Sequence, residues 1–374
     1  LVGLSIRATE EADTLNHLNP ADAALATRYA LLELNGSPSW FSVLYDLHPE
    51  TCTELVFGEI VYALEAKTSD APKNDVIQKV AWHTPWMFNH LAPMVLERLK
   101  KPFSESSGLS ELFAILKESS LEDSSIAALA AVNAVAAKDF DTESAWYALW
   151  VGTDPGVAVP ALSSRLVQIV EADKSAFAMR FLVALMGTFR GDKGSRQAFK
   201  TVEHLKALFL LMHQHVKVEE DIDRTGGGVY SPGLRDDAQH ARDALFSEIR
   251  AIPGKEAYLA LMEISLKHPS EQHRPWAESW AKGKATADAD ISAWTPLQVA
   301  DFDKQLECTP TNHRDLWYLA VDRLENLKRD LEDGDASIAE VLKRVVLETE
   351  MRNYIGDWCR QHAGARYIIP QEEE

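Results

Sequence analysis

The stretch DTESAWYALWVGTDPGVAVPALSSRLVQIVEADKSAFAMRFLVALMG, residues 141–187, carries the pattern that decides the fold. Its apolar residues recur at spacings of three and four, which is the period of one face of an α-helix. The three stripes are Trp146, Leu149 and Trp150, then Leu162, Leu166, Ile169 and Val170, then Phe177, Phe181, Leu182 and Leu185. Because each stripe is one-sided, each helix has to bury it against a neighbour. The stretch therefore predicts three short helices packed side by side.

Helices of the same kind are expected along the whole chain. Many of their starts carry a polar residue followed by proline, which suits the first helical position because its missing N–H would be unpaired there. Such pairs are Asn19-Pro20, Ser37-Pro38, His48-Pro49 and Thr84-Pro85. The helices recur about every 20 residues, or about 40 per helical pair, as in HEAT-like arrays. We predict an all-α fold, an α-solenoid of stacked helical hairpins, with a short extended segment only at residues 366–369.

Two polar, glycine-bearing stretches divide the chain. Residues 188–196 read TFRGDKGSR, and residues 219–232 read EEDIDRTGGGVYSP. Such clusters between periodic segments are typical of loops. They predict an N-terminal helical array at residues 1–190, a linker helix with a Gly-rich loop at 191–230, and a C-terminal helical domain at 231–374 that ends in a connector. The chain starts at Leu1 and ends in QEEE, which resembles the opening of another helix, so we expect a piece of a longer polypeptide.

Charge and cysteine content narrow the range of functions. The chain has 38 basic and 57 acidic side chains, a net charge of −19, and such a field repels nucleic acid. Cys52, Cys308 and Cys359 are far apart, odd in number and form no CxxC pair, which fits a reducing cytoplasm and argues against a disulfide framework or structural zinc. No apolar run approaches the ~18 residues that a membrane helix needs. We expect a cytoplasmic protein without a membrane or nucleic-acid surface.

Several short motifs fall short of a catalytic or binding signature. Gly226–Gly228 is not followed by Gly-Lys-Ser/Thr, so it is not a phosphate-binding Walker A loop. His313–Leu316 reads HRDL, but Ala320 stands where a kinase catalytic loop has asparagine. His213 and His215 are two residues apart and point to different helix faces. We expect no cofactor and no metal site.

Charged residues of both signs cluster on two predicted helices. The first carries Arg235, Asp236, Asp237 and Arg242, and the last carries Glu348 and Arg352. The first cluster forms either an interface with a partner or an internal salt-bridge lattice, and mixed charges on one helix usually mark a solvated, salt-bridged face. On the last helix, paired carboxylates could do acid–base work, but on so acidic a chain they are most often on the surface. These six residues are our candidate interaction residues.

The chain has ten tryptophans. Several come in pairs four residues apart, such as Trp82 and Trp86, Trp146 and Trp150, and Trp276 and Trp280. Core packing between hairpins is the favoured interpretation. The alternative is a groove that grips an aromatic or peptide ligand.

Three stretches toward the C-terminus resemble a known group of proteins. They are YSPGLRDDAQ at residues 230–239, ETEMRNYI at 348–355 and YIIPQEEE at 367–374. They resemble the helical region of large bacterial NACHT/STAND-like NTPases of the antiviral-defence type. In that group a helical array precedes a C-terminal restriction-endonuclease-like domain. The resemblance covers roughly residues 225–374, and the first half only by its helical character.

The resemblance implies a function and two alternatives. A nuclease of that fold holds a divalent metal with a helix glutamate, an Asp and a Glu-x-Lys. Glu372, Glu373 and Glu374 would match the glutamate helix, while the other ligands and the NTPase motifs are absent from this chain. The expected function is therefore a non-catalytic module for protein recognition or interdomain coupling, whose partner is a protein ligand or a neighbouring domain of the same polypeptide. The alternatives are part of a metal-dependent nuclease, or an oligomerisation scaffold.

Overall fold

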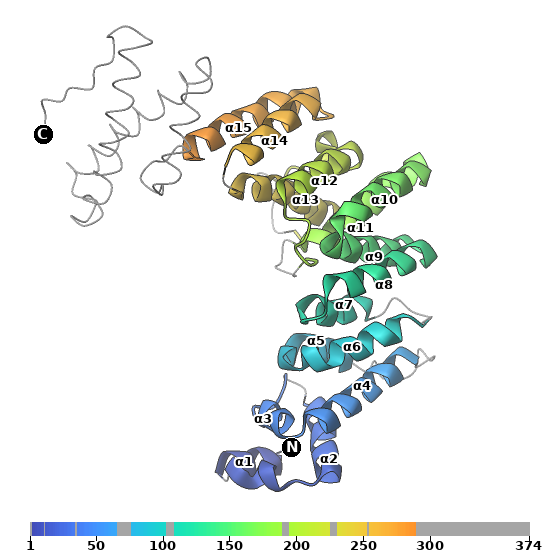
Figure 1. Ribbon diagram of the computed structural model, residues 1–374, viewed down its shortest axis with the longest axis vertical. Helices are drawn as coiled ribbons and strands as arrows, with labels where there is room; N and C mark the ends of the chain where they lie inside the picture. The colour runs from blue at the N-terminus through green and yellow to red at the C-terminus, as the bar shows by residue number, and fades with distance from the viewer. Residues whose placement is uncertain are drawn as a thin grey trace, which may run out of the picture. The chain divides into compact units, whose positions relative to one another are not determined.

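The computed structural model confirms the all-α fold (Figure 1). The structure describes residues 2–10, 12–33, 36–65, 76–101, 108–188, 194–224, 230–252 and 254–288. Within these ranges it contains fifteen α-helices and no strand. The extended segment expected at residues 366–369 lies outside the described residues.

The chain divides into two compact units. Unit 1 comprises residues 1–251 and 267–271, and unit 2 comprises residues 252–266 and those from 272 onward. The sequence analysis placed the main division at residues 191–230 instead. In the structure the helices on both sides of that region, α11, α12 and α13, pack against one another inside unit 1.

Unit 1 contains thirteen described α-helices. They are α1 (Val2–Glu10), α2 (Pro20–Leu31), α3 (Trp40–Leu47), α4 (Pro49–Glu65), α5 (Val76–His83), α6 (Phe88–Leu99), α7 (Leu109–Glu118), α8 (Asp123–Ala136), α9 (Phe140–Thr153), α10 (Pro155–Gln168), α11 (Glu171–Met186), α12 (Val202–His215) and α13 (Leu234–Ala251). Four short 3-10 turns are η1 (Ala12–His17), η2 (Pro85–Met87), η3 (Val218–Glu220) and η4 (Glu271–His273). In unit 2 the structure describes α14 (Lys255–Lys267) and α15 (Arg274–Asp288).

Local capping chemistry explains several of the helix starts. The Asn19 side chain accepts a hydrogen bond from the Asp22 N–H at 3.0 Å, and Pro20 is the first residue of α2. At the start of α9, Asp139 accepts from the Thr142 N–H at 2.8 Å. Each cap satisfies one of the backbone donors that the first turn of a helix leaves unpaired. The polar-residue–proline signal at position 20 is thus confirmed.

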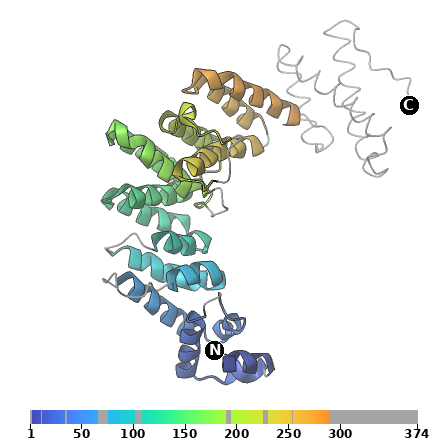
Figure 2. The ribbon, with the colours of Figure 1, turned by 180° about the vertical axis from the view of Figure 1, so that it is seen from behind.

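The helices of unit 1 pack in chain order. Its main contacts join helices that are at most two apart in the numbering. Helices α5, α7, α9, α11 and α13 contact one another in turn, and so do α4, α6 and α8 on the other side (Figures 1 and 2). Two layers of helices therefore run through this part of unit 1, and the odd-numbered layer carries the site described below.

Helix α9 lies at the centre of unit 1, and it buries more than the single apolar stripe that the sequence predicts. Trp146 and Leu149 are buried as predicted, and the Trp146 ring meets the Phe113 ring edge-on at 4.5 Å. However, Tyr147, Ala148 and Val151 are buried as well. The stripe is not one-sided, because α9 contacts α7, α8, α10 and α11 on different sides. The predicted stripe of α11 is buried, and so are Leu162, Leu166 and Ile169 of the α10 stripe, but its last member, Val170, is 65% exposed and was wrongly placed in the core.

Candidate functional site

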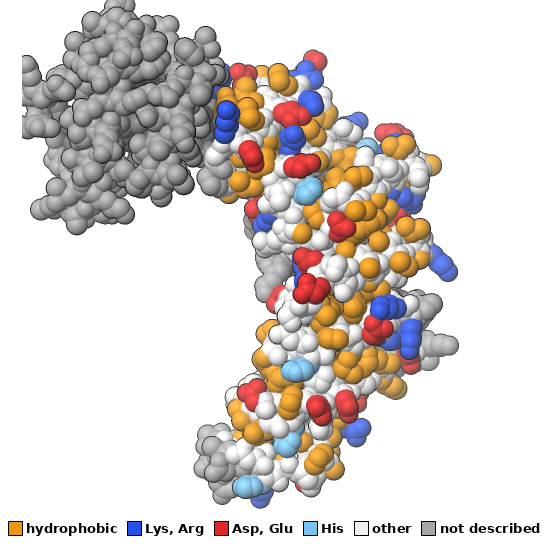
Figure 3. Space-filling view, viewed as in Figure 1, with side chains coloured by type: hydrophobic (Ala, Val, Ile, Leu, Met, Phe, Trp, Pro, Cys, Tyr) orange, Lys and Arg blue, Asp and Glu red, His pale blue; other side chains and the backbone are white. Residues whose placement is uncertain are grey.

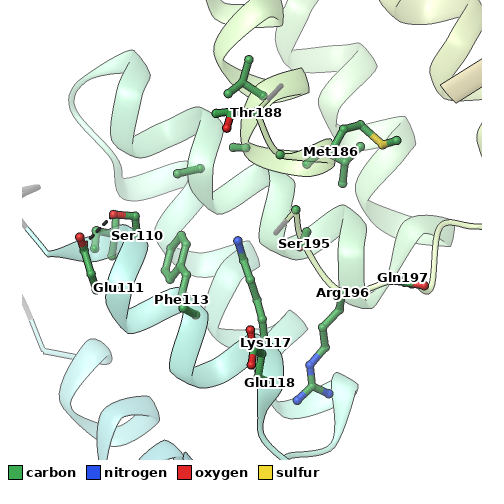
Figure 4. A pocket seen from close by; sticks show the side chains of 18 of the residues that line it. Ser110, Glu111, Phe113, Lys117, Glu118, Met186, Thr188, Ser195, Arg196 and Gln197 are labelled. Carbon is green, nitrogen blue, oxygen red and sulfur yellow. Dashed lines mark hydrogen bonds between the residues drawn. The ribbon is translucent and has the colours of Figure 1, made fainter. Parts of the chain in front are cut away.

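A large cavity opens on the odd-numbered layer of unit 1. Its volume is about 1490 Å³, larger than the roughly 300–1,000 Å³ of most small-molecule clefts. Helices α5, α7, α9, α11 and α13 all contribute side chains to it. Most of the remaining wall is residues 194–200, which follow α11 and which we call the strap (Figure 4).

The strap lies directly on the backbone of two helices. The Ser195 N–H donates to the Leu185 carbonyl at 2.7 Å, and the Ala198 N–H donates to the Gly152 carbonyl at 3.1 Å. A Cβ on Gly152 would lie 2.2 Å from Ser195 Oγ, and a Cβ on Gly194 would lie 2.3 Å from the Leu185 carbonyl oxygen. Only glycine permits this approach, so these two glycines set the position of the strap.

Arg196 ties the strap to the end of α7. Its guanidinium donates to the carbonyl oxygens of Leu116 at 2.9 Å, Ser119 at 2.7 Å and Leu121 at 2.6 Å. It also forms an ion pair with Asp123 at 2.5 Å. The last carbonyls of a helix have no partner within the helix and carry partial negative charge. Arg196 therefore acts as a C-terminal cap of α7 that is supplied by a distant part of the chain.

Lys117 points into the cavity from the last turn of α7. In Figure 4 its amine extends toward the side where Ser195 and Met186 lie, whereas the Arg196 guanidinium points the other way, toward the end of α7. The Lys117 side chain is partly buried, and among the described residues its amine has neither a hydrogen bond nor an ion pair. Burial lowers its pKa from 10.5 to about 8, and the nearby charge of Glu118 offsets part of this effect.

The other cations that line the cavity are paired. Arg196 binds Asp123, and Lys200 binds Glu248 at 2.5 Å. Among the acidic side chains of the lining, Asp141 pairs with Arg180, and Glu111 accepts a hydrogen bond from the Ser110 hydroxyl at 2.7 Å (Figure 4). Of the described lining residues, Lys117 is therefore the cation left without a carboxylate.

Trp82 lies at the same cavity and is mostly exposed. On α5, its side chain is 65% exposed, and the neighbouring Pro85 is exposed too. The core-packing interpretation is correct for Trp40 and Trp146, which are 3% and 1% exposed, and is wrong for Trp82. A large aromatic ring at the mouth of a cavity has no partner in the core and is the kind of side chain that anchors binding partners.

The charged cluster expected on residues 235–242 forms ion pairs within unit 1. Arg242 is 2% exposed, and its guanidinium binds Asp221 at 2.5 and 2.9 Å. Arg235 binds the same Asp221 at 3.0 Å. These pairs hold the segment after α12 against α13, in the manner of the internal salt-bridge lattice considered in the sequence analysis. Asp237 lies in the first turn of the same helix.

Asp236 belongs to the same lattice. It accepts two hydrogen bonds from Arg224, at 2.9 and 3.0 Å, and a third from the Gly233 N–H at 2.9 Å. These bonds, the Arg224 pair above all, lower the pKa of Asp236 to about 2. The Arg224 guanidinium also lies 4.4 Å from the centre of the Tyr230 ring. None of these residues lines the cavity.

The remaining predicted positions are of three kinds. Glu348, Arg352, Glu372, Glu373 and Glu374 lie outside the described residues. His213 is buried and shares a hydrogen bond of 2.9 Å with His268, as in a core histidine. In the described ranges no group of three or more His, Cys, Asp or Glu side chains is arranged to hold a metal.

The described surface carries mixed side chains on the face that is shown. On the face shown in Figure 3, hydrophobic side chains are spread among acidic and basic ones, and Lys and Arg form no continuous strip over the described residues. No helix of the described part is both long and apolar enough to cross a membrane.

The sequence analysis did not identify Lys117 and Arg196 as residues of a site. A lysine in the last turn of a helix is an ordinary choice, because it complements the helix dipole. Phe113, four residues earlier on the same face, is the only local sign that Lys117 points toward packed structure. Arg196 stands in a polar, glycine-bearing stretch that reads as an exposed loop, and nothing near it in the chain reveals the end of α7.

Comparisons with known proteins give no assignment. No protein family, no curated protein and no solved structure matches this chain significantly.

Proposed function

We propose that this chain is a non-catalytic helical-array module that binds a segment of a partner protein in the cavity of unit 1. The observation that carries the proposal is the cavity of about 1490 Å³ with the exposed Trp82 at its edge. An exposed tryptophan supplies a large contact area at low entropic cost, and such residues dominate binding energy at protein interfaces. The serial, two-layer packing supports a solenoid of the HEAT-like kind, because such arrays present a broad surface built from one layer of helices.

The lining chemistry favours binding over catalysis. No histidine or cysteine is among the described residues that line the cavity. The Ser110 hydroxyl donates to the carboxylate of the adjacent Glu111 at 2.7 Å, in an exposed pair at the start of α7, and no histidine of the described lining is present to relay a proton from any serine there. A site made of aromatic, apolar and mostly paired charged side chains is suited to recognition.

The cellular setting is a further part of the proposal. The resemblance of residues 230–239, 348–355 and 367–374 to NACHT/STAND-like antiviral-defence proteins supports a sensor or connector role in the bacterial cytoplasm. The first of these stretches contributes the start of α13 and its lattice with Asp221. The partner would then be a foreign protein or a neighbouring domain of the same polypeptide.

Peptide selection with a matched control tests this function. A display library of random twelve-residue peptides is selected on the wild-type chain and counter-screened on Trp82→Ala. Trp276→Ala serves as control, because Trp276 is 42% exposed but does not line the cavity. We expect the selected peptides to lose at least tenfold in affinity for Trp82→Ala and to bind Trp276→Ala normally. Peptides that bind Trp82→Ala as well as the wild type would contradict the proposal, and so would metal-dependent DNA cleavage or ATP hydrolysis by the purified chain.

A further inference from the structure

We infer that the cavity selects a peptide with one acidic side chain at its centre, and that the Lys117 amine pairs with this aspartate or glutamate carboxylate. The inference rests on the proposed function and names the chemistry of its ligand. Three features of the cavity lead to it: an amine that pairs with no described residue, a lining in which the other described cations are already paired, and apolar surface beside the amine.

The position of the amine provides the first argument. Lys117 extends into the cavity rather than along the surface of α7 (Figure 4), and its amine forms no hydrogen bond or ion pair with a described residue. A partly buried ammonium that makes no hydrogen bond or ion pair is unfavourable, because it has lost water without gaining a direct partner. A carboxylate of the ligand at hydrogen-bonding distance would give the Lys117 ammonium the direct partner that the described residues do not provide.

Protonation provides the second argument. Burial lowers the pKa of Lys117 to about 8, so most of the amine is still charged at pH 7. It can therefore form a charge-assisted hydrogen bond under ordinary conditions. A bound carboxylate would favour the charged form and move the pKa back toward the ordinary lysine value.

The surrounding charges favour a carboxylate over a phosphate. The acidic residues that also line the cavity are Glu111, Glu118, Asp123, Asp141 and Glu248. A phosphate group carries close to two negative charges at pH 7, and one amine cannot compensate both beside these carboxylates. A singly charged carboxylate matches the single amine. Trp82 and Phe113, which line the same cavity, offer apolar contact to the flanking side chains of a peptide.

The inference is tested by titrating the chain with two peptides while the NMR signals of Lys117 and Trp82 are followed in the same sample. The probes are a capped hexapeptide of alternating leucine and glutamine in which one glutamine is replaced by glutamate, and the matched peptide with glutamine at that position. Lysines of the full chain are labelled by reductive ¹³C-methylation, and the NMR signal of Lys117 is identified by its loss in Lys117→Arg. Tryptophans are labelled with 5-fluorotryptophan, and the signal of Trp82 is identified by its loss in Trp82→Phe. The lysine signal reports the charge pair, and the tryptophan signal reports binding of either peptide.

The expected result is specific to the glutamate peptide. The glutamate peptide should raise the pKa of Lys117 by about one unit or more, and it should bind about tenfold more tightly than the glutamine peptide. In Lys117→Met this preference should disappear, while the Trp82 signal still responds to both peptides.

Other outcomes overturn the inference in distinguishable ways. If both peptides shift the Trp82 signal with equal affinity and the pKa of Lys117 stays unchanged, the carboxylate pair is wrong and the proposed function survives. If neither peptide changes either signal at millimolar concentration, both fail. If inorganic phosphate at the same concentration raises the pKa of Lys117 as much as the glutamate peptide does, the selectivity for carboxylate is wrong.

Discussion

The Arg196 guanidinium donates a hydrogen bond of 2.9 Å to the carbonyl oxygen of Leu116, although the two residues are 80 positions apart in the chain. The same guanidinium binds the carbonyl oxygens of Ser119 and Leu121. The end of α7 is therefore completed by the strap and not by its own loop. Because Lys117 is the residue after Leu116, the position of its amine in the cavity depends on this distant cap.

Replacing Arg196 should destabilise unit 1 strongly. Arg196→Ala leaves three backbone carbonyls and Asp123 without their donor in a site where the arginine side chain is only 14% exposed. Since hydrogen bonds to a charged donor contribute more than neutral ones, we expect the free energy of unfolding to fall by about 3 kcal/mol. Urea unfolding followed by circular dichroism measures it.

Arg180→Ala is the control for this change. Arg180 pairs with Asp141, whose side chain is 73% exposed, and is itself 33% exposed. Surface pairs of this kind contribute about 0–1 kcal/mol. A loss at Arg196 no larger than the loss at Arg180 would show that the strap does not hold α7.

A methyl group on Gly152 should displace the strap. In Gly152→Ala the new Cβ would lie 2.2 Å from Ser195 Oγ and 2.8 Å from the Arg196 carbonyl oxygen. The strap has to move away, so we expect a loss of about 2–3 kcal/mol and a shifted NMR signal of Lys117. The matched change Gly58→Ala on α4 meets nothing within 4 Å. It should instead stabilise the helix by up to about 1 kcal/mol. Equal effects of the two substitutions on urea unfolding would argue against the close approach.

Lys117 should reduce the stability of the free protein in a pH-dependent way. Its pKa is about 8 in the folded state against 10.5 as the ordinary value. Below pH 8 both states are protonated and the full penalty of the buried charge applies. Between pH 8 and 10.5 the unfolded chain binds more protons than the folded one, so stability rises with pH.

The variant Lys117→Met removes this penalty. At pH 7 it should unfold with a free energy about 2 kcal/mol higher than the wild type, and the difference should shrink as the pH rises above 8. Lys101→Met controls for the loss of an exposed lysine. A Lys117→Met variant that is less stable than the wild type at pH 7 would mean that the amine has a stabilising partner.

The buried Arg242 should contribute more to the free energy of unfolding than its neighbour Arg235. Arg242→Ala leaves Asp221 and Asp243 beside an empty, buried site, since the Arg242 side chain is 2% exposed and binds both carboxylates. Breaking a buried pair by removing one partner costs about 3–5 kcal/mol. Arg235 is 15% exposed and shares Asp221, so Arg235→Ala should cost less. Thermal unfolding of the two variants decides the order, and the reverse order would contradict a central role for Arg242.

The sequence by itself determined the helices. The stripes of residues 141–187 and the cap at Asn19-Pro20 act within one or two turns, so their effect can be read from spacing alone. The all-α class follows from them. The resemblance near the C-terminus, by contrast, concerns mostly residues that the structure does not describe, and it remains a hypothesis.

Only the tertiary structure decided where the site lies. Lys117, Arg196 and Trp82 come from three separate segments, and their roles depend on which atoms the fold brings near them. Lys117 looks like an ordinary C-terminal lysine until the absence of a partner among the described residues is seen. Arg196 looks like part of a loop until it caps α7, and Trp82 looks like a core residue until 65% of it is exposed. Spacing along a helix reports the neighbours one turn away, whereas burial and charge pairing are set by residues tens of positions distant.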